Sequence, residues 1–193
     1  MSEVNYKEEQ EKSILNDAVA SAFIKQFNLK RLVVGRGHDC GGLIADLCLK
    51  TKVLVEFNDD GWGGEPELNF DKKNMVILVE MLKNVDYAQR MFDNGWAFMK
   101  TTDRISIESQ ITSLVEELAK LKDREKLLKK CKSALIYGNE FSNSVISWKG
   151  IKDLSELDKN NLQRTYDKYK ALLKSNQKFV NTDEQLLKLG IKL

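Results

Sequence analysis

Apolar residues recur along the first part of the chain with two different spacings, which predict one helix and three strands. Over residues 8–28 the apolar positions lie three or four residues apart, as in an amphipathic helix. Residues 31–35 are rich in valine and end at a glycine, which favours a short strand. Residues 43–49 and 53–57 are two apolar runs separated by three polar residues. We expect this pair of runs to form a β-hairpin.

A fourth strand is expected over residues 65–70, with Pro66 at its start, where a strand tolerates proline. From Asp71 the spacing becomes helical again. Asp71 is a candidate N-cap for a helix whose apolar face contains Met75, Leu78, Val79 and Leu82. Asp86 is a candidate cap for a second helix, which ends near Asn94 and Gly95.

The longest regular pattern is a heptad seam over residues 107–128. Its apolar positions alternate steps of four and three residues, and they are Ile107, Ile111, Leu114, Leu118, Leu121 and, after a break at Glu125, Leu128. Two to three heptads are too few for a free-standing coiled coil. The seam therefore packs either on its own chain or across a homodimer, and the sequence does not choose between the two.

The last part of the chain combines a hairpin pattern with two capped helices. Residues 133–149 contain two extended apolar runs around a polar turn. Ser155 to Asp158 has the spacing of a capping box and opens a helix through Leu173, and Thr182 to Gln185 repeats this spacing before a short helix that Gly190 stops.

These patterns predict an α+β protein: a small antiparallel sheet with flanking helices, followed by a long helix and a helical C-terminal region. Residues 1–100 form the sheet domain with its N-terminal helix. Residues 101–193 hold the long helix, the short hairpin and the C-terminal helices, and we expect them to pack as one unit with the first part.

Composition indicates a chain with a real core that works inside a cell. Of the 193 residues, 42% are apolar and 31% charged, and the net charge of +2 argues against a chain that binds nucleic acid or membranes through its overall charge. The sequence shows neither an apolar run long enough to span a membrane nor a secretory signal at its start. Three cysteines do not make a disulfide framework. We therefore expect a cytoplasmic protein that does not bind membranes.

Charge is distributed unevenly along the chain. Residues 31–71 carry four Lys and Arg against eight Asp and Glu, and residues 120–132 carry seven against two. Either these segments compensate each other within the fold, or each is presented to a partner.

Glycine concentrates between Gly35 and Gly64, around the single histidine. This stretch holds seven of the eleven glycines, and glycine is required where the backbone adopts positive φ or approaches another group closely. His38, Asp39 and Cys40 lie together here, and Cys48 follows eight residues after Cys40. A structural zinc site needs four ligands, usually closely paired, so we expect no metal and no cofactor. His38 and Cys40 are a candidate catalytic pair, but residues this close in sequence rarely adopt the geometry that an activated nucleophile needs. We therefore expect no enzyme activity.

The second glycine-rich turn carries acidic residues and a tryptophan. Its glycines do not complete a phosphate-binding motif. Asp59, Asp60 and Glu65 offer a weak cation site, but the calcium-loop pattern is missing. We interpret the turn as a tight structure that exposes Trp62, a residue type that dominates many protein interfaces. Asp59, Asp60, Trp62 and Glu65 are therefore the predicted partner-binding residues.

The basic segment is a candidate nucleic-acid interface. Lysines that neutralise phosphates give salt-dependent binding that tolerates many sequences, although no recognition-module signature is present. The alternative is an ordinary solvated helix face. The residues of this lysine run are Lys120, Lys122, Arg124, Lys126, Lys129, Lys130 and Lys132.

The hairpin over residues 43–57, closed by residues 60–64 and followed by helices, resembles uncharacterised small proteins encoded by large bacteriophages. Residues 145–150, 162–163 and 181–191 share this resemblance. It implies a viral accessory role inside the host cell, where such proteins bind and disable a host factor, and it transfers no catalytic residues. We therefore expect a non-enzymatic protein that binds and inhibits a host defence or nucleoprotein complex, with nucleic-acid binding through the lysine run as the alternative.

Overall fold

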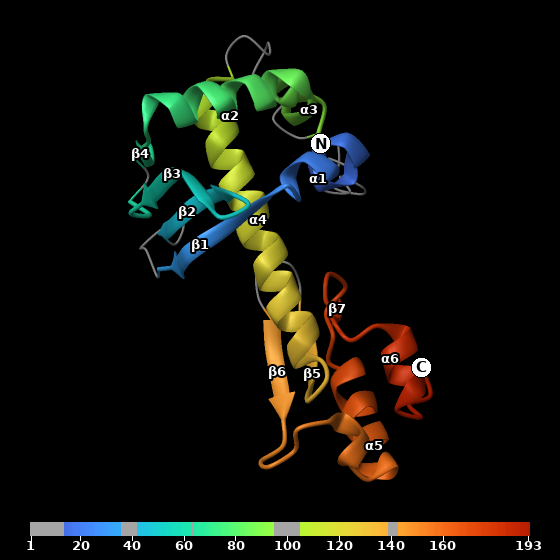
Figure 1. Ribbon diagram of the computed structural model, residues 1–193. Coiled ribbons are helices and arrows are strands. Elements are labelled where there is room, and N and C mark those ends of the chain that lie inside the picture. The colour runs from blue at the N-terminus through green and yellow to red at the C-terminus, as the bar shows by residue number, and fades with distance from the viewer. Residues whose placement is uncertain (1–13, 36–41, 63, 95–104, 139–142) are drawn as a thin grey trace, which may run out of the picture. The chain divides into compact units, whose positions relative to one another are not determined.

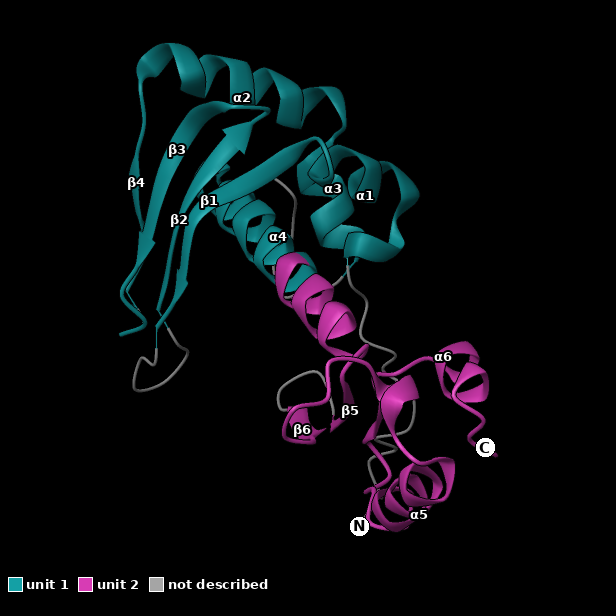
Figure 2. Cartoon of the chain, turned by 60° about the horizontal axis from the view of Figure 1, so that its bottom comes forward, with its two compact units in different colours: residues 1–121 teal, residues 122–193 magenta. Residues whose placement is uncertain are grey.

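The computed structural model describes residues 14–35, 42–62, 64–94, 105–138 and 143–193 (Figure 1). By its internal packing the chain divides into two compact units, unit 1 (residues 1–121) and unit 2 (residues 122–193) (Figure 2). Unit 1 contains an antiparallel four-stranded sheet in the order β1-β2-β3-β4, and unit 2 contains a three-stranded sheet in the order β6-β5-β7. The predicted α+β class is confirmed.

Unit 1 opens with a short helix and a strand where the sequence indicated one continuous helix. After a 3₁₀ turn (Ile14–Asn16), α1 spans Ala18–Ile24 and β1 spans Phe27–Val34. The expected helix over residues 8–28 is therefore wrong beyond Ile24, and its residues 8–13 lie outside the described ones. The ring of Phe27 packs edge-on against Phe23 at a centroid distance of 5.1 Å. The four-residue spacing of Phe23 and Phe27 therefore matches a contact across the turn from helix to strand and not one along a continuous helix.

The predicted hairpin is confirmed. β2 (Leu43–Leu49) and β3 (Lys52–Asp59) pair antiparallel, and β3 pairs with the short strand β4 (Glu67–Asn69). Lys50, in the two-residue turn between β2 and β3, adopts a left-handed conformation with φ of 56°. The carbonyl of Lys50 accepts a hydrogen bond from Asn28 at 2.7 Å, which ties the turn to β1.

The two predicted aspartate caps behave differently. α2 spans Lys72–Asn84, and its N-cap Asp71 accepts a hydrogen bond from the amide of Lys73 at 2.7 Å, as expected. α3 spans Tyr87–Asp93 after Asp86, but the side chain of Asp86 makes no capping bond to the described helix and its φ is 51°. The helix starts where it was predicted, without the predicted cap.

One apolar core holds unit 1 together. It joins one face of the sheet to the buried sides of α1, α2, α3 and the long helix α4 (Ile107–Lys130). Of the heptad seam, Ile111, Leu114 and Leu118 are buried in this core, so these positions pack within one chain. A homodimer through the rest of residues 107–128 stays a prediction.

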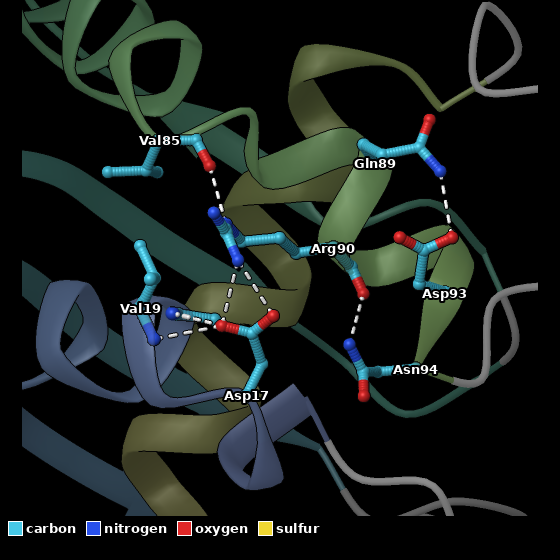
Figure 3. A network of polar contacts seen from close by, with 8 residues as sticks. Asp17, Val19, Val85, Gln89, Arg90, Asp93 and Asn94 are labelled. Carbon is cyan, nitrogen blue, oxygen red and sulfur yellow. Dashed lines mark hydrogen bonds and ion pairs between the residues drawn. The ribbon is translucent and has the colours of Figure 1, made fainter.

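An ion pair fastens α1 to α3 (Figure 3). Asp17 caps α1 by accepting the amides of Val19 and Ala20, both at 2.9 Å. Its two carboxylate oxygens also accept hydrogen bonds of 2.9 and 2.8 Å from the guanidinium of Arg90, which donates in turn to the carbonyl of Val85 at 2.7 Å. The acceptance of the Ala20 amide is the largest cause that lowers the pKa of Asp17, and Arg90 adds to it.

Unit 2 combines its sheet with the end of α4 and with the helices α5 (Lys159–Lys170) and α6 (Asp183–Lys188). β5 (Ala134–Gly138) pairs with β6 (Asn143–Ser147), as predicted, and with the short strand β7 (Lys178–Phe179), which the sequence pattern did not indicate. α6 begins at Thr182 with a complete capping box that Gln185 closes.

The predicted helix from Ser155 to Leu173 is too long at both ends. A 3₁₀ turn (Leu154–Glu156) comes first, and Leu157 is extended. The helix α5 itself spans Lys159–Lys170 and is capped by Asp158.

A buried asparagine connects β5 to the segment after β7. Asn181 is 2% exposed. Its Oδ1 accepts the amide of Ile136 at 2.7 Å, and its Nδ2 donates to the carbonyls of Cys131 and Ala134 at 3.1 and 3.0 Å. Because the amide of Val180 donates to the carbonyl of Ile136, the Asn181 side chain continues the β5–β7 ladder by one rung.

Candidate functional site

Two aspartate side chains stabilise the turn that follows β3 by accepting hydrogen bonds from backbone amides two residues further on. Asp59 accepts the amide of Gly61 at 2.8 Å, and Asp60 accepts the amide of Trp62 at 2.9 Å. Gly61 has φ of 74°, a conformation that favours glycine. The turn holds Trp62 with 69% of its surface exposed, and the predicted residue Glu65 is exposed after the turn. Asp59 and Asp60 therefore shape the turn as well as charge it.

The two glycine-rich segments meet at this end of the sheet. The amide of Gly35 donates to the carbonyl of Gly42 at 2.7 Å, which joins the ends of β1 and β2. A Cβ atom added to Gly42 would lie 2.8 Å from the carbonyl oxygen of Asp59 and 3.2 Å from that of Asp60. Backbone therefore packs directly on backbone here, and only glycine fits at position 42 without a shift.

Exposed apolar side chains lie at the same end of the sheet as the turn. Val34 pairs with Leu43, which pairs with Asp59 on the next strand. In the adjacent row, Val33 pairs with Ile44. Val33, Val34 and Ile44 are 56%, 68% and 46% exposed. We call this region the tryptophan end; it consists of Val33, Val34, Ile44, Asp59, Asp60, Trp62 and Glu65.

The outer face of the sheet next to the tryptophan end is acidic. Arg31 donates to both carboxylate oxygens of Asp46, and its guanidinium lies 3.6 Å from Glu56. Asn69 donates to Glu56 at 3.1 Å. A shallow hollow of about 320 Å³ lies here, lined by Arg31, Ile44, Glu56, Phe57, Asn58, Glu67 and Asn69. Sequence reasoning missed this face, because only the strand register brings its residues together.

Negative charge also reaches the tryptophan end from α4. Loss of hydration is the largest cause that raises the pKa of Glu116; Lys120 opposes the shift, and the charges of Glu117 and Asp59 add to it. Over the whole sequence, residues 1–121 carry 15 Lys and Arg against 20 Asp and Glu, a net charge of −5. Unit 1 is therefore acidic overall.

The lysine run lies along the second part of α4 and the turn after it. Lys120 pairs with Glu117 at 2.8 Å, and Lys132 lies 3.7 Å from Asp153. Arg124, Lys126, Lys129 and Lys130 are exposed, whereas Lys122 is half-buried. Residues 122–193 carry 16 Lys and Arg against 9 Asp and Glu, a net charge of +7.

Unit 2 also contains a row of aromatic rings that sequence reasoning did not identify. The rings come from β5, α5 and β7, which are distant in sequence, so no local spacing reveals the row. The only available signal was the proximity of two tyrosines and two lysines within residues 166–170. The rings belong to Tyr137, Tyr166, Tyr169 and Phe179.

Of the residues considered for zinc binding and nucleophilic chemistry, the structure describes only Cys48. His38, Asp39 and Cys40 lie outside the described residues. Cys48 is fully buried on β2, and its thiol donates to the carbonyl of Asp46 at 3.6 Å. Within the described ranges, no three His, Cys, Asp or Glu side chains are placed to hold a metal ion.

No protein-family model, no curated protein and no solved structure matches this chain. Among the described helices, none combines the length and the apolar character that crossing a membrane requires.

Proposed function

We propose that this chain is a non-enzymatic binding protein that attaches to a basic protein partner through the tryptophan end of unit 1. Following its resemblance to bacteriophage proteins, the partner is a host protein of a defence or nucleoprotein complex, which the chain inhibits in the host cytoplasm.

The observation that carries this proposal is the exposure of Trp62 on a turn whose backbone is fixed. Tryptophan is among the residues that contribute most to binding at protein interfaces. Two aspartate bonds and the close packing of Gly42 hold the turn in place. A side chain presented by an ordered turn loses little conformational freedom on binding, which favours affinity.

Charge supports a basic partner. Asp60 and Glu65 are exposed beside Trp62, and Glu56 and Glu67 are exposed on the adjacent sheet face. Opposite charge on a partner increases the association rate and suppresses wrong partners. A nucleoprotein complex offers such basic protein surfaces.

Affinity capture tests the proposal. The tagged chain is incubated with a bacterial lysate with and without nuclease, and the bound material is identified by mass spectrometry. We expect a stoichiometric protein that survives nuclease treatment. Material that disappears with nuclease and leaves no protein behind would contradict the proposal.

A charge variant tests whether the captured partner binds at Asp59 and Asp60 of the tryptophan end. In the double variant Asp59→Asn/Asp60→Asn each side chain keeps the oxygen that accepts the turn amide but loses its charge. We expect slower association and a weaker dependence on salt. Unchanged association would remove Asp59 and Asp60 from the interface.

A second candidate function, nucleic-acid binding by the lysine run, is supported by the exposure of the second part of α4. Residues 122–130 contain no buried side chain, and unit 2 has a net charge of +7. This candidate predicts an affinity that falls steeply as salt rises, for duplex and single strands alike.

A further inference from the structure

We propose that unit 2 binds single-stranded nucleic acid on the row of aromatic rings and the lysines around it. We call this the aromatic–lysine surface; it consists of Tyr137, Tyr169 and Phe179 with Lys168, Lys170 and Lys178. It uses other residues than the tryptophan end and the lysine run, and it does not depend on the proposed protein partner.

The rings form a continuous row. Tyr169 of α5 lies 5.3 Å from Tyr137 of β5, between ring centroids, and Tyr137 lies 6.1 Å from Phe179 of β7. Phe179 stacks on Tyr166 at 4.8 Å. Tyr166 is buried at 4% exposure and anchors the row, while Tyr137, Tyr169 and Phe179 are partly exposed.

The lysines supply positive charge beside the rings. Lys168, Lys170 and Lys178 are exposed. The ammonium groups of Lys168 and Lys170 lie 5.5 and 5.6 Å from the ring centroids of Tyr169 and Tyr166. Such exposed cation–π contacts are weak, so the ammonium groups can turn to phosphates at little cost. The carboxylate of Asp167, the neighbour of Lys168 in sequence, accepts a hydrogen bond from the side-chain amide of Gln163 at 2.8 Å.

This combination favours a single strand over a duplex or an acidic protein. Proteins that bind single strands pair basic residues with aromatic rings on which bases stack. The bases of a duplex strand are stacked about 3.4 Å apart and are not available to side-chain rings. Tyr137, Tyr169 and Phe179 are partly exposed and tilted against one another by 38° and 59°, so they offer differently oriented ring surfaces to unstacked bases. An acidic protein would use the lysines but would gain little from the ring faces.

Binding is measured by fluorescence anisotropy with the full chain, a labelled oligothymidine of roughly 20 nucleotides, longer than the site of one single-strand-binding module, and a duplex of the same length. We expect preference for the single strand and an affinity that falls with salt with a logarithmic slope of about −2, for roughly three phosphate contacts. Tyr169→Leu should weaken binding roughly tenfold, because it removes one stacking ring. Tyr169→Phe should retain binding.

The lysine variants separate this surface from the lysine run. The triple variant Lys168→Gln/Lys170→Gln/Lys178→Gln should reduce both the affinity and the salt slope. Lys159→Gln, at the opposite end of α5, should change neither. Since these lysines are exposed, this comparison decides the matter even if Tyr169→Leu fails to fold.

Three results would overturn the inference. One is wild-type affinity in both Tyr169→Leu and the triple lysine variant. Another is loss of binding only when Lys126, Lys129 and Lys130 are replaced, which would favour the lysine run. The third is displacement of the oligonucleotide by polyglutamate at equal charge concentration, which would indicate an acidic protein ligand.

Discussion

Replacing Asn181 by alanine should strongly destabilise unit 2. The side chain is 2% exposed and makes three buried hydrogen bonds, to the amide of Ile136 and to the carbonyls of Cys131 and Ala134. Asn181→Ala leaves these groups without that partner. Leaving a buried polar group unpaired costs about 1–3 kcal/mol, and less where a carbonyl keeps another bond, so we expect a loss of about 3–5 kcal/mol. Small domains have a total stability of about 5 kcal/mol or somewhat more.

This loss is measured by unfolding the chain in urea and monitoring the peptides of unit 2 by hydrogen-exchange mass spectrometry. With a slope of about 1 kcal/mol per molar urea, the midpoint should fall by about 3 M or more. Asn160→Ala, on the exposed side of α5, is the matched control and should change the midpoint little. A loss below about 1 kcal/mol in Asn181→Ala would refute the reasoning, because it is smaller than the cost of one unpaired group.

Three further predictions concern local features. Gly42→Ala places a Cβ 2.8 Å from the Asp59 carbonyl and should lower the free energy of unfolding by about 1–3 kcal/mol. Gly64→Ala is the control, because its Cβ would meet no atom of the described residues within 4 Å. Equal thermal stabilities of the two variants would contradict this prediction. Burial raises the pKa of Cys131 to about 11, so iodoacetamide at about pH 8 should label this thiol only after unfolding. Labelling of Cys131 in the native chain at the rate of a peptide thiol, read by peptide mass spectrometry, would be the contrary result. The lowered pKa of Asp17 stabilises the fold above about pH 4 and this contribution is lost as pH falls through the folded-state pKa, so Asp17→Asn should be less stable than wild type at about pH 7 and approach it in acid; a gap independent of pH in urea titrations would refute the assignment.

Local signals predicted several elements that local interactions determine, although the caps expected at Asp86 and Ser155 were wrong. The β2–β3 hairpin, the Asp71 cap and the capping box at Thr182 each depend on residues close in sequence, and each is confirmed. The spacing of Phe23 and Phe27 wrongly predicted a helix that continues through Phe27. Their rings touch, as i and i+4 side chains of a helix would, but through a turn from helix to strand.

Contacts between distant segments could not be predicted in this way. β7 has two residues, and it is defined by its pairing with β5. Asn181 bonds to residues at least 45 positions away. The turn carrying Trp62 was predicted, but its packing against Gly42 follows only from the strand register.

The central claim, that the chain binds a protein through the tryptophan end, is tested most directly by the affinity of Trp62→Ala for the captured partner after nuclease treatment. Val76→Ala, which truncates a side chain that is 57% exposed on α2, is the matched control. Isothermal titration should show Trp62→Ala weakened roughly 30-fold or more, as for a residue at the centre of an interface, and Val76→Ala near wild type. Wild-type affinity in Trp62→Ala would contradict the claim and place the binding surface elsewhere on the chain.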